Sequence, residues 1–592
     1  MVNDLQTLMR ENNIDWFIVF SNDEHLSEYT SEADRYLATL TGFTGSSGTL
    51  LVAQHEAYLW TDSRYFVQGA AQLKGTGITL MKSGTPGVQT IEDFLADHVW
   101  EGQIVAFDLK TVSYRQYLTL KKHLPASVEV RDASDVLKKS VSSMPKRSFS
   151  KIDALPSDCE GRSSKEKIEK LREKIRKEYV TEDSYTYILS DLCSIMWLFN
   201  IRGSDITYVP VAYSYAMIDQ FSAKLYVSRK DLSDEAKTKL EKTGVILKEY
   251  SQFYNDLREI STDVVLADPY ANNSRIMTIC DGIGSLVESS DPVLVPKAYK
   301  NATEIKGMKE SHLMDAVTMI RFIKKVKEMA KEGNLPNEYE MGKMLDNMRL
   351  SGGAEALSFK TICAYKENCA IVHYIAHEKT AKDIKPEGFL LVDSGGQYRF
   401  KGTTDITRTI SLGPVSDEEK KVYTTVLKGN LRLMNMVFPQ GYTGAILDMA
   451  AEEPLWNEGY FCGHGIGHGV GCYLSVHESE ARISRREGDR EIDMLPGVVV
   501  SDEPGVYLEG KFGVRLENLL LVERADPIDG YAMCRFRPLT LVPFDRESVD
   551  VSLLSDIEKE VLRKYNEMIV EEVGPLLDEA ERSWLKEIID IK

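Results

Sequence analysis

Two aspartates in the second half of the sequence sit where the chain is expected to turn, a position from which they could bind metal ions. The apolar run at residues 389–392 ends in Asp393, and a glycine-rich segment separates it from Asp405. Polar and apolar residues then alternate, so Asp405 and Thr407 share one face of an expected strand, opposite Ile406. A hairpin-like return would bring Asp393 beside Asp405. Since aspartate is common at strand ends, this pair alone fits two turn carboxylates better than a site.

A second strand and turn repeat this arrangement. An apolar strand leads into Glu503, and Pro504-Gly505 is a strong turn signal. The expected return strand, residues 513–522, carries Glu517 inside an apolar run, with Arg515 on the same face. Burial of Glu517 is costly unless a cation compensates its charge. That cation is either Arg515 or a metal ion, and in the second case Arg515 would contact a ligand of the metal.

Two histidines lie in a segment that has glycine at every second position. This segment, residues 463–471, contains His464 and His468, and its glycines exclude a helix and imply close backbone approach. It therefore differs from the helical histidine pair of zinc peptidases, and it lacks the Gly-Lys-Ser/Thr of a phosphate loop. Five of the ten histidines fall within 105 residues of this part of the chain: His373, His377, His464, His468 and His477.

Taken together, four carboxylates and one imidazole form a suitable ligand set for a pair of divalent metal ions. The set is Asp393, Asp405, His468, Glu503 and Glu517. Bridging carboxylates hold two such ions about 3.5–4 Å apart. Oxygen-rich ligation favours Mn²⁺, with Co²⁺ or Zn²⁺ as alternatives, and the lack of cysteine in the set argues against a closed structural zinc site.

The elements that position these residues are expected in an α/β (α+β) chain of two to four domains, given its 592 residues. Apolar runs predict strands at residues 17–20, 48–52 and 104–107, and a helical pattern covers residues 88–98. This alternation predicts an α/β domain over residues 1–150. A stretch rich in Ser, Pro and Lys, residues 140–163, is expected to be a linker.

A second domain is expected over residues 151–298 and a third over residues 299–592. The second has expected helices at 164–179 and 191–199 and strands at 185–189 and 223–227, an order that resembles the first domain. The third opens with a long helix over residues 302–331, because an apolar stripe that includes Ala316, Ile320 and Ile323 recurs at helical spacing.

Composition excludes several classes of partner. A formal net charge of −19 disfavours nucleic acid and anionic membrane surfaces, because both would be repelled. No apolar stretch approaches the roughly 20 residues that a membrane helix needs. The 8 cysteines are scattered without paired spacing, which favours reduced thiols and a cytoplasmic location.

The motifs around the five ligand candidates resemble the methionine aminopeptidase and creatinase group, whose catalytic domain has the pita-bread fold. They are most similar to the Xaa-Pro aminopeptidases (aminopeptidase P) in their long three-domain form. The matching catalytic motifs are Val-Asp393-Ser-Gly, Thr-Thr-Asp405-Ile-Thr-Arg-Thr, His464-Gly-Ile-Gly-His468-Gly-Val-Gly, Asp-Glu503-Pro-Gly and Arg515-Leu-Glu517-Asn. Three N-terminal motifs, at residues 23–29, 42–48 and 60–66, and one at residues 197–205 extend the resemblance to nearly the whole chain.

The resemblance implies a role for each ligand candidate. Asp405 and Glu517 would bridge two metal ions, and Asp393, His468 and Glu503 would complete their ligand sets. Glu503 is also the candidate to accept a proton from the attacking water and to pass it to the leaving proline nitrogen.

The resemblance also implies roles for residues that do not bind metal. His464 and His477 would hydrogen-bond the tetrahedral oxygen or the substrate backbone, and His373 would flank the proline ring. Arg515, in the same motif as Glu517, is a further candidate catalytic residue. The implied activity is release of the N-terminal residue from peptides whose second residue is proline, by a homodimer that binds neither nucleic acid nor a membrane.

Two alternatives share the fold. A prolidase, which cleaves only Xaa-Pro dipeptides, has the same five ligands, and the length and N-terminal motifs favour the aminopeptidase over it. A binding module without catalysis, as in some histone chaperones, would be expected to have lost ligands, whereas all five are present.

Overall fold

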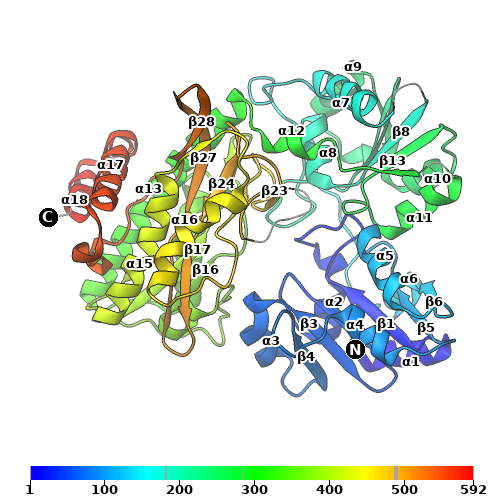
Figure 1. Cartoon of the computed structure of the whole chain (residues 1–592), viewed down its shortest axis with the longest axis horizontal. Helices are drawn as coiled ribbons and strands as arrows, with labels where there is room; N and C mark the ends of the chain where they lie inside the picture. Colours follow the sequence, from blue (N-terminus) through cyan, green and yellow to red (C-terminus); the bar gives the residue numbers. More distant parts are fainter. Residues whose placement is uncertain (1, 181–182, 285, 486–490, 591–592) are drawn as a thin grey trace. The chain divides into compact units, whose positions relative to one another are not determined.

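The computed structural model describes residues 2–180, 183–284, 286–485 and 491–590. The chain forms two compact units, which are described separately: an N-terminal unit of residues 1–155 and 162–294, and a C-terminal unit of residues 156–161 and 295–592 (Figure 1). The predicted three-domain boundaries at residues 150 and 298 remain a prediction. Within the described residues, no helix has the length and apolar character to cross a membrane.

The N-terminal unit is built from two six-stranded sheets with flanking helices. The first sheet has the order β4-β3-β2-β1-β5-β6 and the second has the order β12-β11-β10-β8-β13-β14. Their strands are β1 (Trp16–Phe20), β2 (Thr49–Val52), β3 (Ala57–Thr61), β4 (Ile78–Lys82), β5 (Ile104–Phe107), β6 (Glu129–Asp132), β8 (Tyr185–Leu189), β10 (Tyr215–Asp219), β11 (Ala223–Val227), β12 (Val245–Glu249), β13 (Val264–Ala267) and β14 (Leu286–Glu288). The helices are α1 (Val2–Glu11), α2 (Tyr36–Thr41), α3 (Phe66–Gln72), α4 (Ile91–His98), α5 (Tyr114–His123), α6 (Ser134–Ser140), α7 (Ser164–Glu178), α8 (Leu192–Phe199), α9 (Asp234–Lys242), α10 (Phe253–Arg258) and α11 (Ser274–Ile283).

The two sheets repeat one topology strand for strand. In each, the central strand pairs antiparallel with the next strand of the sheet on one side and parallel on the other, as β1 does with β2 and β5, and β8 with β10 and β13. Reciprocal backbone hydrogen bonds join the copies: Tyr114 N donates to Asn272 O at 3.2 Å, and Ser274 N donates to Val112 O at 2.9 Å. The similarity that element order indicated in the sequence is therefore a real repeat of architecture.

Most of the predicted elements of this unit are confirmed, with differences at their ends. Helix α4 begins at Ile91 because the side chain of Thr90 caps it by accepting a hydrogen bond from Asp93 N. The expected linker at residues 140–163 is partly ordered. Within it, β7 (Asp153–Ala154) pairs with β9 (Ile201–Arg202), so backbone pairing stabilises a stretch whose composition is typical of a loop.

The C-terminal unit combines a six-stranded sheet, β21-β28-β27-β24-β22-β23, with smaller sheets β16-β17-β20, β15-β18-β19 and β25-β26. Its strands are β15 (Ala356–Leu357), β16 (Ile362–Tyr365), β17 (Phe389–Ser394), β18 (Gly396–Tyr398), β19 (Gly402–Thr403), β20 (Ile406–Ser411), β21 (Val437–Pro439), β22 (Gly467–Gly469), β23 (Glu478–Ile483), β24 (Val499–Asp502), β25 (Gly505–Leu508), β26 (Phe512–Arg515), β27 (Asn518–Ile528) and β28 (Tyr531–Pro538). The helices are α12 (Leu294–Ala298), α13 (Ala302–Glu332), α14 (Glu338–Ser351), α15 (Asp417–Met434), α16 (Gly444–Asn457), α17 (Asp556–Glu572) and α18 (Glu579–Ile589).

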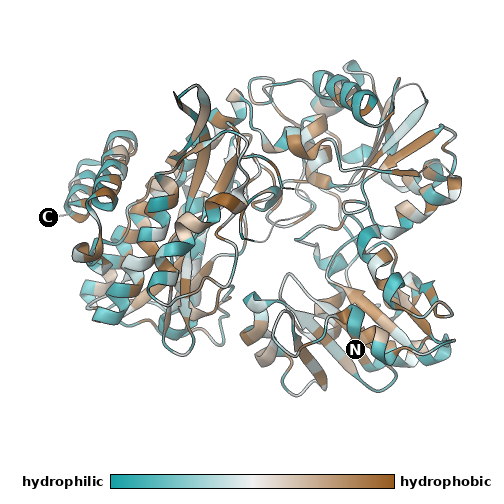
Figure 2. Cartoon of the chain, in the orientation of Figure 1, coloured by the Kyte–Doolittle hydropathy of each residue, from teal (hydrophilic) through white to brown (hydrophobic). Residues whose placement is uncertain are grey.

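Helix α13 shows why the sequence forms these elements. Asn301 and Glu304 form a capping box at its start, and Gly333 ends it in the left-handed conformation. Its predicted apolar stripe is buried, with Ala316 and Ile320 in the core of the unit. Figure 2 shows the same division across the unit, with mostly hydrophobic strands and helices that carry both kinds of residue.

Candidate metal centre

The first pair of carboxylates is brought together by two antiparallel strands. Strand β17 ends with Asp393 and Ser394 and pairs with β20, so that Asp393 lies opposite Thr407 and Asp405 immediately precedes the paired strand. A Cβ at Gly395 would lie 1.9 Å from Thr404 O, so only glycine permits this approach. The predicted return of the chain, with Asp393 beside Asp405, is confirmed.

The second pair is placed by a more elaborate turn than the sequence indicated. Strand β24 pairs antiparallel with β27, but the hairpin β25–β26 is inserted between them. The predicted single return strand over residues 513–522 is therefore wrong, because Leu516 and Glu517 separate β26 from β27. The backbone N–H of Glu517 does not pair with β24. It donates to Thr407 O at 3.1 Å. That bond joins the segment that carries Glu517 to the strand that follows Asp405.

His468 comes from β22, which lies against β24. A Cβ at Gly467 would lie 2.0 Å from Ser501 O, which explains the glycine beside the histidine. The Nδ1 atom of His468 lies 2.9 Å from Gly469 O, so the proton on Nδ1 is donated there. Its Nε2 atom then faces one oxygen of Asp405 and one of Glu503, each at 3.5 Å. This tautomer suits a metal ligand.

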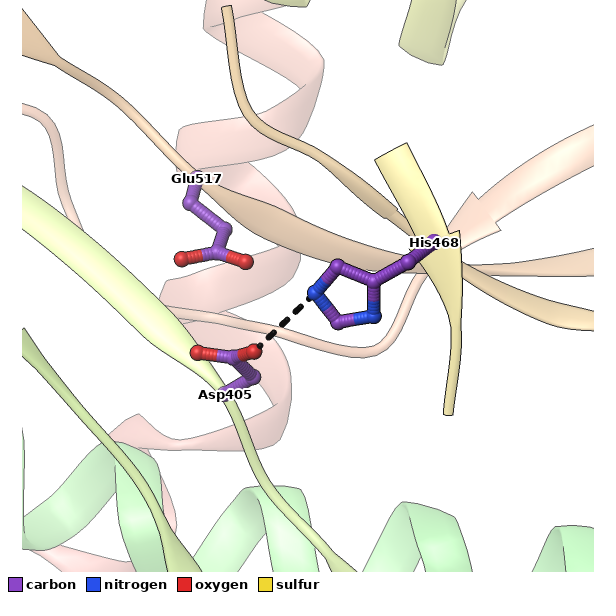
Figure 3. Close-up of side chains that lie close together, drawn as sticks. All are labelled: Asp405, His468 and Glu517. Carbon is purple, nitrogen blue, oxygen red and sulfur yellow. Dashed lines mark ion pairs between the residues drawn. The ribbon is translucent and has the colours of Figure 1, made fainter. Parts of the chain in front are cut away.

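These elements assemble a compact set of possible metal ligands. One ligand atom each from Asp405, His468 and Glu517 lie within 4.8 Å of one another. Figure 3 shows the three side chains converging from separate strands and turns. One buried oxygen of Asp393 and one of Asp405 have no hydrogen-bond partner among the described residues. Buried, unpartnered carboxylate oxygens are costly, and a divalent cation would satisfy them.

Electrostatics support the same conclusion. Burial raises the pKa of Glu517 well above its ordinary value, and the charges of Asp405 and Glu503 raise it further. Burial also raises the pKa of Asp405. For His468, burial lowers the pKa, but the hydrogen bond to Asp405 and the charge of Glu503 outweigh it and raise the pKa to about 9. The centre therefore has an excess of negative charge, and His468 must lose its proton before it can bind a metal ion.

Arg515 compensates a different carboxylate from the one that its sequence position suggested. Its guanidinium forms an ion pair with Asp393 at 2.6 Å and donates to the hydroxyl oxygen of Thr407 at 3.0 Å. The Thr407 hydroxyl in turn donates to Glu517 at 2.8 Å. The interpretation in which Arg515 alone neutralises Glu517 is therefore not supported, and Arg515 instead holds the carboxylate of Asp393.

The three predicted non-ligand histidines differ in their surroundings. The ring of His477 lies edge-on to that of His468 with 4.5 Å between centroids. His464 Nε2 lies 2.7 Å from the hydroxyl oxygen of Tyr507. His373 lies in the segment between β16 and β17, and its position beside a substrate stays a prediction.

The roles of three residues of this centre were not predicted from the sequence. The hydroxyl of Tyr507 bridges His464 and Arg515, which donates to it at 2.8 Å. The Ser501 hydroxyl accepts from His468 N at 2.9 Å and donates to Glu503 at 3.1 Å. Alternation along β24 could have indicated Ser501, two residues before Glu503. Thr407 was assigned to the face of Asp405, but its bonds to Glu517 and Arg515 depend on distant strands.

Family models match the chain in four segments. Residues 306–524 match metallopeptidase family M24, and residues 1–140 and 143–304 each match a creatinase/prolidase N-terminal domain. Residues 532–590 match the C-terminal region of the M24 peptidases.

Individual relatives are similar over nearly the full length. The chain is 33% identical over 611 residues to a probable Xaa-Pro aminopeptidase P of Pyricularia oryzae, covering 98% of this chain and 97% of that protein. A probable Xaa-Pro aminopeptidase P of Neurospora crassa is 35% identical, with 97% of this chain and 86% of the relative covered. The crystal structure of an X-prolyl aminopeptidase from Caenorhabditis elegans, described as a cytosolic enzyme with a di-nuclear active site, superposes with a TM-score of 0.93 at 30% identity, covering 98% and 95% of the two chains.

Proposed function

The chain belongs to metallopeptidase family M24, in its Xaa-Pro aminopeptidase P group, and on that premise we propose a two-metal mechanism for its active site. The enzyme releases the N-terminal residue from peptides whose second residue is proline. The proposed metal ligands are Asp393, Asp405, His468, Glu503 and Glu517. The observation that carries the proposal is the convergence of three of them, Asp405, His468 and Glu517, within 4.8 Å.

The five side chains would hold two divalent ions, with Asp405 and Glu517 contributing to both. Mn²⁺ fits best because four of the five side chains offer oxygen, and Co²⁺ and Zn²⁺ tolerate the same ligands. When bound, such ions would supply Lewis acidity, which activates water near neutral pH and polarises the scissile carbonyl.

Glu503 is the proposed proton carrier. Its carboxylate is half-buried, whereas those of Asp405 and Glu517 are buried, so Glu503 is more open to water than either. The hydrogen bond from Ser501 fixes one of its oxygens. Glu503 accepts a proton from the attacking water and delivers it to the proline nitrogen as the peptide bond breaks.

Histidines orient the substrate in this proposal. His464 is held by Tyr507, and His477 lies against the metal ligand His468, so both can donate to the substrate carbonyl or backbone. His373 flanks the proline ring. Because the bond to proline has no N–H, selection cannot use that donor and must come from a shaped apolar pocket.

A substrate and metal series tests the function. After chelation, Mn²⁺, Co²⁺ and Zn²⁺ are added back singly, and cleavage of Arg-Pro-Pro, Arg-Pro and Arg-Ala-Ala is measured. We expect metal-dependent release of arginine from Arg-Pro-Pro and little from the other two. Cleavage of Arg-Pro alone would make the enzyme a prolidase, and no cleavage with any metal would favour a binding module.

We further propose a homodimer in the cytoplasm. Helix α16 exposes Ile446, Met449 and Trp456 on its outer side, with exposed fractions of 55%, 61% and 42%. Exposed apolar residues in a group support a protein contact. A light-scattering mass that matches one chain would contradict the dimer.

The proposed cytoplasmic location is supported by the relative that is described as cytosolic. It is also supported by the lack of any disulfide among the 8 cysteines, all of which are in the described residues.

A further inference from the structure

Apart from the metal ligands, one fully buried carboxylate organises the segment that carries His373. Glu338 is the first residue of α14 and has 0% of its surface exposed. We propose that Glu338 is a positioning residue, which fixes the segment between β16 and β17 so that His373 meets the substrate. This inference rests on the proposed function for the role of His373.

Each carboxylate oxygen of Glu338 accepts two hydrogen bonds, from the end of β16 and from this segment. The Oε1 atom accepts from Tyr365 N at 2.7 Å and from the Asn368 side chain at 2.9 Å. The Oε2 atom accepts from the Tyr374 hydroxyl at 2.7 Å and from Lys382 N at 2.9 Å. One carboxylate therefore binds the last residue of β16 and three points along the segment, and Tyr374 is the neighbour of His373.

The four donors are uncharged groups. The ammonium of Lys382 pairs instead with Glu367, so Lys382 reaches Glu338 through its backbone. Several hydrogen bonds can satisfy the oxygens of a buried carboxylate without a cation. Its place in the first turn of α14 also suits an acidic side chain, because the positive end of the helix dipole lies there. Glu338 thus differs from the metal ligands, some of whose oxygens lack a partner.

The segment is connected to the metal centre as well as to Glu338. It begins with a short 3₁₀ helix, Lys366–Ala370, in which Cys369 O lies 2.1 Å from where a Cβ of Gly513 would be. Gly513 is in β26, two residues before Arg515, and the thiol of Cys369 lies 3.7 Å from Phe389 O of β17. The segment therefore packs between the strand that ends in Arg515 and the strand that ends in Asp393. A shift of the segment would move His373 relative to the metal ligands.

A double-mutant cycle between Glu338 and His373 tests the proposal on the metal-loaded enzyme. In Glu338→Gln, the side-chain amide that replaces one oxygen faces the N–H of Lys382, so two donors oppose each other. We expect kcat/KM for Arg-Pro-Pro to fall about 10–100-fold with the metal content unchanged, since displacement of a positioning group by about 1 Å has effects of this size. In the His373→Ala background, the same change should cost less than about twofold.

Independent, multiplicative losses in this cycle would overturn the proposal, because Glu338 would then act through general stability. The control is Glu340→Gln, an exposed residue in the first turn of the same helix, which should leave kcat/KM unchanged. If Glu338→Gln does not fold, Tyr374→Phe removes one of the four hydrogen bonds and should show a smaller loss with the same coupling to His373.

Hydrogen exchange separates this inference from the proposed function. Amides at residues 366–382 should exchange faster in Glu338→Gln than in wild type, whether or not any peptide is cleaved. Unchanged exchange would contradict the positioning role. A wild-type protein without Xaa-Pro cleavage under any metal would contradict the proposed function, while faster exchange in the variant would still show that Glu338 holds the segment.

Discussion

Buried carboxylates in the two units of the chain are stabilised in different ways. In the N-terminal unit, Glu24 pairs with Arg147 and with Lys110 at 3.2 Å, and it accepts from the Tyr250 hydroxyl at 2.7 Å. Burial raises the pKa of Glu24, but Arg147 and Lys110 outweigh it and hold this pKa well below its ordinary value. The same Arg147 pairs with Asp34 at 2.7 Å. Protein cations thus compensate these acids.

The metal centre of the C-terminal unit has too few cations for its acids. Arg515 pairs with Asp393, and the pKa values of Asp393, Asp405 and Glu517 are all raised, first of all by burial. The comparison teaches that burial of a carboxylate does not by itself indicate a site. Several buried carboxylates that converge with too few protein cations do, because a bound metal ion can balance their charge.

Loss of a proposed bridging ligand should have the largest effect on activity. Asp405→Ala or Glu517→Ala should lower metal-dependent cleavage of Arg-Pro-Pro by more than about 100-fold, since even residues that only support ligands are worth 10–100-fold. The control is Glu523→Ala, a partly exposed residue of β27 paired with Lys309, which should change the rate by less than about twofold. Full activity after both ligand changes would end the two-metal mechanism.

Metal removal should reverse the sign of the stability change that Glu517→Gln causes. At a metal concentration about 100 times Kd, bound metal stabilises the fold by about 2.7 kcal/mol, so chelation should lower the Tm of the wild type. In the metal-free protein, Glu517→Gln should raise the Tm, because it removes one of several buried like charges. In the metal-loaded protein the same change should lower it. An equal effect in both states, measured by calorimetry, would mean that no metal balances Glu517.

The contribution of the buried acid Glu24 of the N-terminal unit to stability should not depend on metal. Glu24→Gln leaves Arg147 and Lys110 with less compensation and should cost roughly 1–3 kcal/mol of stability with or without metal. Because the pKa of Glu24 is lowered in the folded state, its contribution is present above the unfolded pKa and is lost as the pH falls. Denaturant melts at neutral and acidic pH check both points, and a metal-dependent loss would break the contrast between the units.

The smallest effect on stability is expected at Asp291, a buried acid of the N-terminal unit. Burial raises its pKa to about 7, although hydrogen bonds from Tyr187 and Val293 lower it. A raised pKa means that the folded state holds a proton, so stability falls as the pH rises from about 4 through 7. Asp291→Asn should remove that fall, so that the Tm of the variant stays level between about pH 4 and 7 while that of the wild type declines. A Tm that declines with pH as steeply as in wild type would contradict this.

Much of the fold and of the site could be predicted because the signals are local. The strand 104–107 and the long helix α13 follow from periodicity and from caps such as Asn301. Asp393 and Asp405 were expected to meet because a glycine-rich return joins their strands.

What could not be predicted depends on pairing between distant strands. Arg515 bonds to Asp393 because β20 and β26 lie together, which the sequence order does not reveal. The hairpin β25–β26 interrupts an apolar run that reads as continuous, and it brings Tyr507 beside His464. Glu338 reads as an ordinary first-turn glutamate, and its role is visible only once Tyr365, Tyr374 and Lys382 surround it.

The metal content of the purified protein tests the central claim most directly. After Mn²⁺ loading and removal of free ions, elemental analysis of the wild type should give two ions per chain, and Glu517→Ala should lose both tight binding and cleavage of Arg-Pro-Pro. Glu24→Gln should retain two ions, because its acid is balanced by Arg147. A wild type that cleaves Arg-Pro-Pro without bound metal, or that keeps two ions after Glu517→Ala, would contradict the account.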